Sequence, residues 1–225
     1  MESLAIIAEF NPFHTGHARL IRQVRQAAGP EAAIVIIMSG AFVQRGEPAF
    51  FDKWHRAAWA IDGGADVVIE LPAVYALSSA AGFAQGGVTL AARLGCQALA
   101  CGVEGGTAAD FLSLARRSEG LTACLKAAKK SSAGQQLTDA LMAAAPDEAR
   151  LLQQPNALLA FEYARAMLKQ EQPLTFLPLP RQGRHGDTGL GAAFASASAL
   201  RQAMRCSGTA AACRPYLIAA SLAGA

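Results

Sequence analysis

Two of the four histidines in the chain lie in the segment Asn11-Pro12-Phe13-His14-Thr15-Gly16-His17. This segment follows a short apolar run and precedes a helical pattern, which predicts a turn leading into a helix. A helix N-terminus offers N–H groups and the positive end of the helix dipole, and a glycine lets an anion approach the backbone. Each imidazole can donate an N–H to a charged oxygen. The segment therefore predicts a site that stabilises charge on an α-phosphate during in-line attack.

Two other interpretations of this turn stay open at this point. It can be a structural turn that carries its histidines on the surface. It can also contribute to a zinc site. Such a site needs a third and a fourth ligand, and the only candidates in the sequence are His55 and scattered carboxylates. We therefore expect no metal held by protein ligands.

A second candidate phosphate site is Ser196-Ala197-Ser198-Ala199-Leu200-Arg201, which follows a glycine-rich loop at residues 183–191. Ser196 or Ser198 can cap the last predicted helix, whose first N–H groups can hold an anion. Arg201 can neutralise a leaving pyrophosphate. Serine caps are usually structural, so this motif gains meaning only beside the first one. Together they predict one site for the α-phosphate and one for the β- and γ-phosphates.

A third cluster, MSGAFVQRGEPAFFDKWHR at residues 38–56, gathers cations beside an aromatic ring. Such a cluster favours a polyanion or an acidic co-substrate. The structural alternative is a solvated loop followed by a helix with Asp52 as its N-cap. Clustering of cations here and in the helical middle of the chain predicts an RNA-contacting set: Arg45, Lys53, Arg56, Arg116, Arg117, Lys126, Lys129 and Lys130.

Short apolar runs that alternate with helical patterns must position these clusters. Strands are predicted at residues 4–8, 33–38, 67–69, 98–102 and 174–179, and helices at 17–25, 52–61, 78–93, across most of 108–170 and from 198. The strands, including 67–69, are continuous apolar runs typical of buried strands. The pattern indicates an α/β fold with a parallel sheet covered by helices on both faces. Ligands bind such sheets at the carboxyl ends of the strands, where the candidate clusters lie.

Composition excludes several classes of protein. The 225 residues are 52% hydrophobic and 16% charged, the reverse of a disordered chain, and the net charge of +3 permits a nucleic-acid partner without requiring one. Five cysteines without a CxxC pair indicate buried thiols in a reducing compartment. We see no basic signal-peptide start and no apolar stretch near the ~20 residues of a membrane helix. We therefore expect a cytoplasmic protein with no membrane partner.

Four segments together resemble the tRNA(Met) cytidine acetate ligases of the HIGH-type nucleotidyltransferase superfamily: IIAEFNPFHTGH, MSGAFVQRGEPAFFDKWHRA, GADVVIELP and SASALR. The resemblance covers residues 1–204, less specifically in the helical middle. It implies a Rossmann-like ATP-binding domain over residues 1–205, with a helical insertion at 108–170. Members of this family are considerably longer, so residues 206–225 are expected to be a truncated C-terminal tail, whose apolar end at 216–225 is expected to be a helix without its partner. Such a tail could form an oligomer contact.

The resemblance also implies a reaction. Acetate attacks the α-phosphate of ATP, and the N4 amine of the wobble cytidine of elongator tRNA(Met) then takes the acetyl group from acetyl-adenylate. Mg²⁺ is the expected companion of ATP. The catalytic candidates are His14, His17 and Arg201. The ATP-binding candidates, together with the two serines of the second phosphate motif, are Ile7, Asn11, Pro12, Phe13, His14, Thr15, Gly16, His17, Leu20, Gly102, Asn156, Arg181, Ser196 and Ser198.

Two alternative functions stay open. A generic adenylyltransferase would join AMP to a phosphorylated small molecule with the same phosphate site. A non-catalytic remnant would bind nucleotide or RNA without turnover. The short C-terminal region of the chain, compared with the family, favours this third hypothesis.

Overall fold

The computed structural model of the chain describes residues 2–44, 46–125, 133–181, 196–207 and 211–217. Within them, five strands form one sheet in the order β3-β2-β1-β4-β5, and every neighbouring pair is parallel. This confirms the predicted α/β fold with a parallel sheet. The strands are β1 (Ser3–Ala8), β2 (Ala33–Ser39), β3 (Val67–Leu71), β4 (Ala98–Val103) and β5 (Thr175–Pro180).

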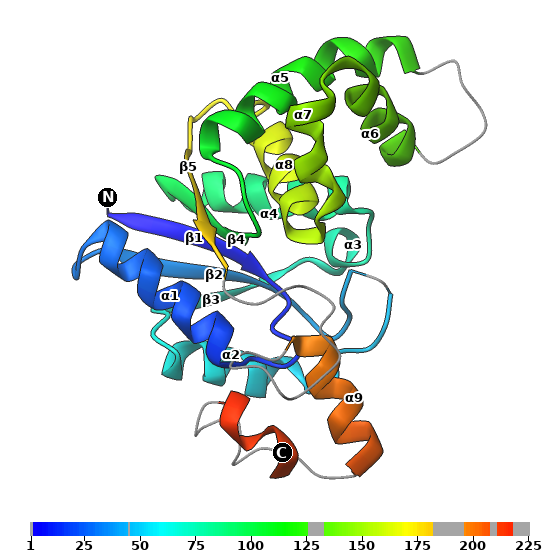
Figure 1. Cartoon of the computed structure of the whole chain (residues 1–225). Coiled ribbons are helices and arrows are strands. Elements are labelled where there is room, and N and C mark those ends of the chain that lie inside the picture. The colour runs from blue at the N-terminus through cyan, green and yellow to red at the C-terminus, as the bar shows by residue number, and fades with distance from the viewer. Residues whose placement is uncertain (1, 45, 126–132, 182–195, 208–210, 218–225) are drawn as a thin grey trace.

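Helices cover both faces of this sheet (Figure 1). One face carries α1 (Thr15–Ala28) and α2 (Lys53–Asp62). Beyond the ends of the strands, α9 (Ala197–Ser207) and η2 (Ala211–Tyr216) lie together near the C-terminus. The other face carries the larger group of helices: α3 (Ala73–Ala76), α4 (Ala80–Arg93), α5 (Ala108–Leu125), α6 (Ala133–Ala144), α7 (Pro146–Ala149), η1 (Arg150–Gln153) and α8 (Pro155–Met167).

Side chains that alternate along β1 divide the core between the two faces. Leu4 and Ile6 pack in the cluster formed with α1 and α2, whereas Ala5 and Ile7 pack in the cluster formed with α4, α5 and α8. All four side chains are buried. The continuous apolar run in the sequence therefore reflects burial of β1 on both of its faces.

Strand β3 differs from the prediction of a buried strand. It forms one edge of the sheet, and Val67 is 41% exposed. An edge strand has a neighbour on one side only, so its apolar residues need not be covered. The short helix α3 was also not predicted, because the Pro72 turn separates it from the longer helical pattern of α4.

The start of the apolar end at 216–225 is packed, which corrects the expectation that this end lacks a partner. Tyr216 and Leu217 are buried against Leu200 and Met204 of α9, and together they form a small separate core. Residues 218–225 lie outside the described residues. The division of the chain at residue 205 stays a prediction.

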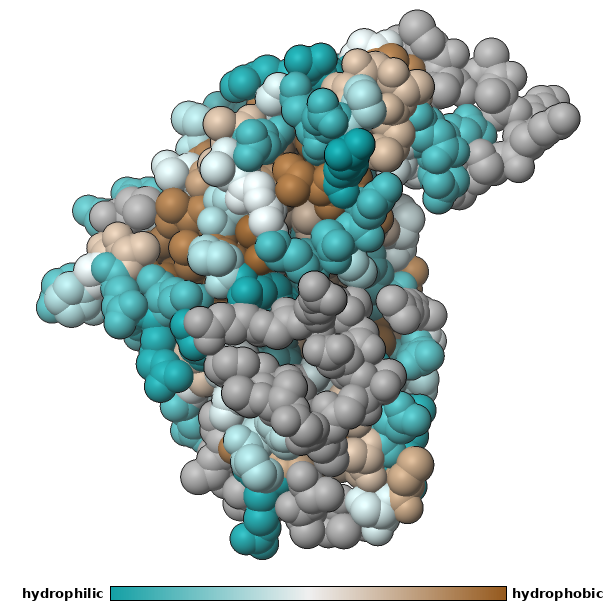
Figure 2. Space-filling model, viewed as in Figure 1, coloured by the Kyte–Doolittle hydropathy of each residue, from teal (hydrophilic) through white to brown (hydrophobic). Residues whose placement is uncertain are grey.

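Hydrophobic residues on the face shown in Figure 2 gather in the middle, over β5 and α8, and hydrophilic residues cover much of the rest. None of the described helices is long and apolar enough to cross a membrane. Among the cysteines with described side chains, Cys96, Cys101 and Cys213 are buried as predicted, whereas Cys206 is exposed.

Candidate active site

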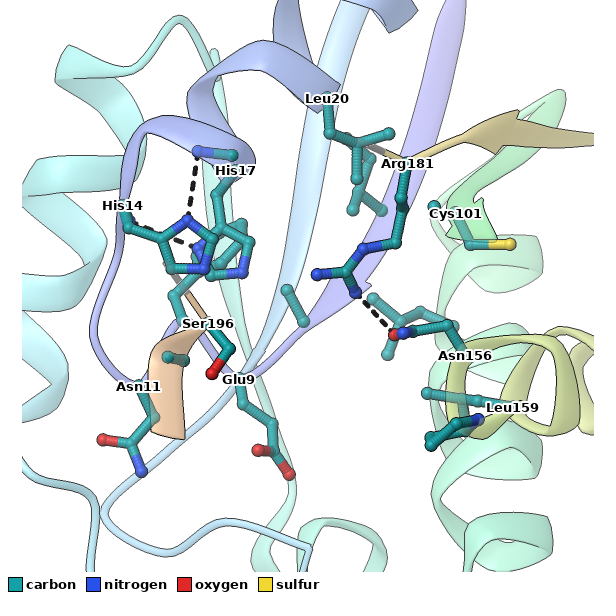
Figure 3. A pocket seen from close by; sticks show the side chains of 18 of the residues that line it. Glu9, Asn11, His14, His17, Leu20, Cys101, Asn156, Leu159, Arg181 and Ser196 are labelled. Atoms are coloured by element: carbon teal, nitrogen blue, oxygen red, sulfur yellow. Dashed lines mark hydrogen bonds between the residues drawn. The ribbon is translucent and has the colours of Figure 1, made fainter. Parts of the chain in front are cut away.

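A cavity of about 390 Å³ lies at the carboxyl ends of β1 and β4. These two strands are neighbours at the centre of the sheet, where the strand order changes direction, and parallel sheets bind their ligands at this switch point. One wall comes from the turn after β1 and the start of α9. The opposite wall comes from α8 and the end of β5 (Figure 3). The cavity therefore joins candidate residues that lie far apart in the sequence.

His14 and His17 form a stacked pair, with ring centroids 3.7 Å apart. Nδ1 of His14 accepts a hydrogen bond from the Gly16 N–H at 3.0 Å, and Nδ1 of His17 accepts one from the His14 N–H at 3.3 Å. A neutral imidazole has one donor nitrogen and one acceptor nitrogen, so each ring carries its proton on Nε2. The pair therefore offers two oriented N–H donors at the cavity.

Burial keeps both rings neutral. It lowers the pKa of His14 to about 3, and the positive charge of Arg181 contributes further. Burial also lowers the pKa of His17 well below its usual range, with smaller effects from His14 and Arg181. The pair can therefore stabilise an anion through fixed hydrogen-bond dipoles, which need no rearrangement when charge develops.

At the start of α1, the backbone N–H groups of Gly16 and His17 are already used in hydrogen bonds, so the imidazoles are the donors left for a phosphate. The Gly16 N–H donates to the His14 ring, and the His17 N–H donates to the His14 carbonyl at 2.9 Å, so both groups serve the helix cap. A Cβ at position 16 would lie 2.8 Å from the His14 ring. Glycine is therefore needed here to admit the ring, whereas the sequence suggested that it admits an anion.

The start of α9 lies at the same cavity and is tied to the histidine turn. Ser196 Oγ accepts a hydrogen bond from the Ala199 N–H at 3.1 Å, which shows that Ser196 rather than Ser198 caps this helix. Arg201 donates to the Asn11 carbonyl at 2.5 Å and contacts the Ser198 hydroxyl at 3.4 Å. The two predicted phosphate motifs are thus neighbours in the fold, although Asn11 and Arg201 lie 190 residues apart in the chain.

A second polar chain forms the opposite wall of the cavity. Arg181 donates to Asn156 Oδ1 at 2.7 Å, and the Asn156 amide donates in turn to Glu104. Glu104 also accepts a hydrogen bond from the Ala157 N–H at 3.1 Å, so it anchors the start of α8. A Cβ at Gly102 would lie 2.8 Å from Arg181 Cγ, and the glycine therefore lets this side chain cross the end of β4.

Most of the predicted ATP-binding residues line the cavity. Pro12, Phe13 and Thr15 are not among its lining residues; Phe13 is fully buried, and its ring packs on Phe10 with centroids 4.9 Å apart. Phe13 therefore packs in the core beneath the histidine turn and stabilises it, which corrects its assignment as a nucleotide contact. The predicted residues that do line the cavity are Ile7, Asn11, His14, Gly16, His17, Leu20, Gly102, Asn156, Arg181, Ser196, Ser198 and Arg201.

The prediction that Arg56 contacts RNA is wrong. Its side chain is fully buried, and the guanidinium donates to the carbonyls of Glu9 at 2.6 Å, Ser39 at 3.1 Å, Phe51 at 3.0 Å and Gly40. Five N–H donors in a planar fork suit this arrangement. Arg56 fastens the ends of β1 and β2 to the start of α2, and so positions the floor of the site.

The other predicted RNA contacts are partly buried, exposed or outside the described residues. The Lys53 side chain is 34% exposed and pairs with Glu70 at 2.6 Å. Arg116 and Arg117 are exposed, and Arg117 pairs with Glu148 at 3.4 Å. Four of the predicted RNA contacts lie outside the residues that the structure describes: Arg45, Lys126, Lys129 and Lys130.

Glu9, Glu104 and Tyr163 belong to the site but were not predicted. Glu9 and Tyr163 line the cavity, and Glu104 holds Asn156. Glu9 and Glu104 each directly follow a strand, and that position is the signal that could have identified them. Tyr163 lies inside a helical pattern and gave no signal.

The parallel sheet, the switch-point cavity and the histidine pair at the first crossover define a nucleotidyltransferase domain. A model of the HIGH Nucleotidyl Transferase family matches residues 1–223, and the chain belongs to this family.

The curated relatives are more specific, and they confirm the resemblance seen in the sequence. The tRNA(Met) cytidine acetate ligases of Pediococcus pentosaceus, Syntrophomonas wolfei and Latilactobacillus sakei are 40%, 41% and 39% identical to this chain over 90%, 91% and 98% of its length. The chain spans about half the length of these relatives, at 53%, 51% and 56%.

Solved structures show the same fold. Thermotoga maritima TmcAL bound with alpha-thio ATP matches 99% of this chain with a TM-score of 0.86 and 32% identity, and 55% of that chain is covered. Its apo form I also matches with a TM-score of 0.86, at 30% identity.

Proposed function

We propose that this chain activates acetate with ATP and transfers the acetyl group to N4 of the wobble cytidine of elongator tRNA(Met), in the cytoplasm. The observation that carries the proposal is the stacked, neutral pair of His14 and His17, held as Nε2–H donors in a cavity that also contains Arg181 and Arg201. The names of the relatives supply the substrate class, and the ATP analogue bound by the Thermotoga maritima enzyme supports the nucleotide.

In the first step, an acetate oxygen attacks the α-phosphorus of ATP. The new oxygen–phosphorus bond forms as the bond to the β-phosphate oxygen breaks, and pyrophosphate leaves. Negative charge grows on the non-bridging oxygens, to which the Nε2–H groups of His14 and His17 donate. Because these donors are already oriented by the helix cap, they bind the transition state better than the ground state.

The start of α9 receives the leaving group. Arg201 and the N-terminus of α9, capped by Ser196, provide positive charge for the β- and γ-phosphates. On the opposite wall, Gly102, Asn156 and Arg181 receive the adenosine, with Asn156 held in one orientation by Glu104.

Magnesium is proposed to arrive with the triphosphate. The described residues contain no group of three or more His, Cys, Asp or Glu side chains that could hold an ion. Mg²⁺ binds phosphates with few protein ligands, so this donor set fits a metal that the nucleotide brings. When bound, it would neutralise phosphate charge.

One assay separates the three candidate functions. ATP–pyrophosphate exchange is measured with and without acetate, and tRNA(Met) is then analysed for N4-acetylcytidine by mass spectrometry. Acetate-dependent exchange followed by acetylation supports the proposal. Exchange that depends on a phosphorylated metabolite instead supports a generic adenylyltransferase, and ATP binding without exchange supports a non-catalytic protein.

The RNA surface is tested separately by its salt dependence. Neutralising Lys129 and Lys130 removes two potential phosphate contacts, so the slope of log affinity for tRNA against log salt should become shallower by up to about 2. An unchanged slope would argue against a role for these two lysines.

A further inference from the structure

Two polar side chains of the cavity have no part in ATP activation as proposed above. Glu9 follows β1 directly, and Tyr163 lies on the inner side of α8; both line the cavity with Ile7, Phe83 and Leu159. Figure 3 shows the Glu9 side chain directed away from the imidazoles of His14 and His17, so it does not face the expected phosphates. These residues mark a part of the cavity that nucleotide binding leaves unexplained.

The Tyr163 hydroxyl is a candidate hydrogen-bond partner for a ligand in the cavity. Its side chain is 1% exposed, and the hydroxyl has no hydrogen-bond partner among the described residues. Burial raises the pKa of Tyr163 well above its usual range, with smaller effects from Cys101 and Glu9, so the phenol stays protonated. A buried hydroxyl without a partner is costly to folding, and a molecule bound in the cavity would supply the missing partner.

Glu9 is held in place from two sides. Its Oε1 accepts a hydrogen bond from the Gln44 N–H at 2.8 Å, and its carbonyl accepts one from the buried Arg56 at 2.6 Å. The carboxylate has further lone pairs, which can accept hydrogen bonds from a ligand. Glu9 is thus a fixed acceptor in the same cavity as the Tyr163 hydroxyl, and the charge of Glu9 acts on that hydroxyl; apolar side chains of Phe83 and Leu159 belong to the same lining.

We propose that Glu9 binds the exocyclic amine of the acceptor cytosine and takes its proton during acetyl transfer, with Tyr163 positioning the same base. This inference rests on the proposed function and deepens it. The amine nitrogen forms a bond to the acetyl carbonyl carbon, and the bond from that carbon to the AMP oxygen breaks. AMP leaves with the electron pair, one amine proton passes to the Glu9 carboxylate, and the carboxylate later releases it to water.

The chemistry of the base fits this pair of side chains. The N4 amine of cytosine is a hydrogen-bond donor, and carboxylates are its typical acceptors. Uracil presents a carbonyl oxygen at the same place, which the carboxylate would repel. Glu9 therefore also selects an amine-bearing pyrimidine over one that bears a carbonyl.

The test compares the two half-reactions in the full chain. Glu9→Gln keeps the acceptor for the Gln44 N–H but cannot take a proton. We expect acetate-dependent ATP–pyrophosphate exchange within about 3-fold of the unsubstituted chain, and acetyl transfer to tRNA lowered about 100-fold or more. The matched control is Glu31→Gln, an exposed position just before β2, at the amino-terminal ends of the strands and outside the cavity lining, which should change neither rate.

Tyr163→Phe provides the second variant. Because the hydroxyl has no partner in the described part of the chain, its removal should leave the thermal midpoint unchanged or raised while acetyl transfer falls about 10-fold. A variant that transfers normally overturns the role of Tyr163.

Each remaining outcome decides a different claim. Normal transfer by Glu9→Gln, or equal losses in exchange and transfer, overturns the assignment of Glu9. Exchange without any transfer in the unsubstituted chain overturns it as well, because the acceptor site would then be incomplete in this chain. Absence of exchange in the unsubstituted chain contradicts the proposed function instead.

Discussion

The buried imidazole of His14 predicts how the stability of the folded chain depends on pH. Burial lowers the pKa of His14 to about 3 from an ordinary value of 6.5. Between these two values the unfolded chain binds a proton on this ring and the folded chain does not, so acid favours unfolding. His14 therefore contributes stability that is complete above about pH 6.5 and is lost progressively as the pH falls towards 3. His17 acts in the same direction.

The size of the effect follows from the pKa difference. At pH 5 the solution is 1.5 pH units below 6.5, and each unit corresponds to about 1.4 kcal/mol, so His14 lowers the free energy of unfolding by about 2 kcal/mol. That is a large fraction of the roughly 5–15 kcal/mol that stabilises a typical domain.

The substitution His14→Asn isolates this contribution. Asparagine can accept the Gly16 N–H hydrogen bond as an N-cap and does not titrate. We expect urea unfolding curves at pH 8 and pH 5 to show that the variant loses about 2 kcal/mol less on acidification than the unsubstituted chain does.

His55 provides the control for the loss of a histidine, because its imidazole is exposed and lies on α2, outside the cavity lining. His55→Asn should leave the loss of stability in acid in place. Equal acid losses for the unsubstituted chain and His14→Asn would mean that the folded protein protonates His14 readily. The account of two neutral donors would then be wrong.

Three further substitutions test the packing around the site. Arg56→Lys should lower the free energy of unfolding by about 2–4 kcal/mol in urea titrations, because one ammonium cannot serve carbonyls from three segments; an unchanged midpoint would contradict its role. Gly102→Ala should displace Arg181 and raise the Kd for ATP about 10-fold by calorimetry, and an unchanged Kd would show that the Arg181 position is unimportant. Glu104→Gln should raise the same Kd by a similar factor and lower the thermal midpoint, whereas a change in neither would argue against anchoring of Asn156.

The sequence predicts the central architecture well because the signals are local. Strands β1, β2 and β4 are continuous apolar runs, and the glycine and histidines of the first crossover lie in one short segment. The N-cap Asp52 was also predicted correctly, since its side chain accepts from the N–H groups of Trp54 and His55. Local patterns of this kind need no knowledge of the tertiary fold.

The errors arise where burial depends on distant segments. Arg56 is basic and lies in a charged stretch, so the sequence suggests a surface residue; only the folded arrangement of β1, β2 and the loop before α2 surrounds it with carbonyls. Val67 looks like a core residue but lies on an edge strand. Tyr163 is one aromatic in a helix until α8 packs at the cavity. Strand order and helix docking decide all three, and neither is written in local spacing.

The central claim is that the switch-point cavity beside His14 and His17 holds ATP. Isothermal titration calorimetry of the purified chain with ATP and Mg²⁺ tests it directly. We expect saturable binding at one site, with a Kd of roughly 1 µM to 1 mM, the range in which the KM values of enzymes usually fall. If the purified chain is folded and binds no ATP at millimolar concentration, the claim is contradicted.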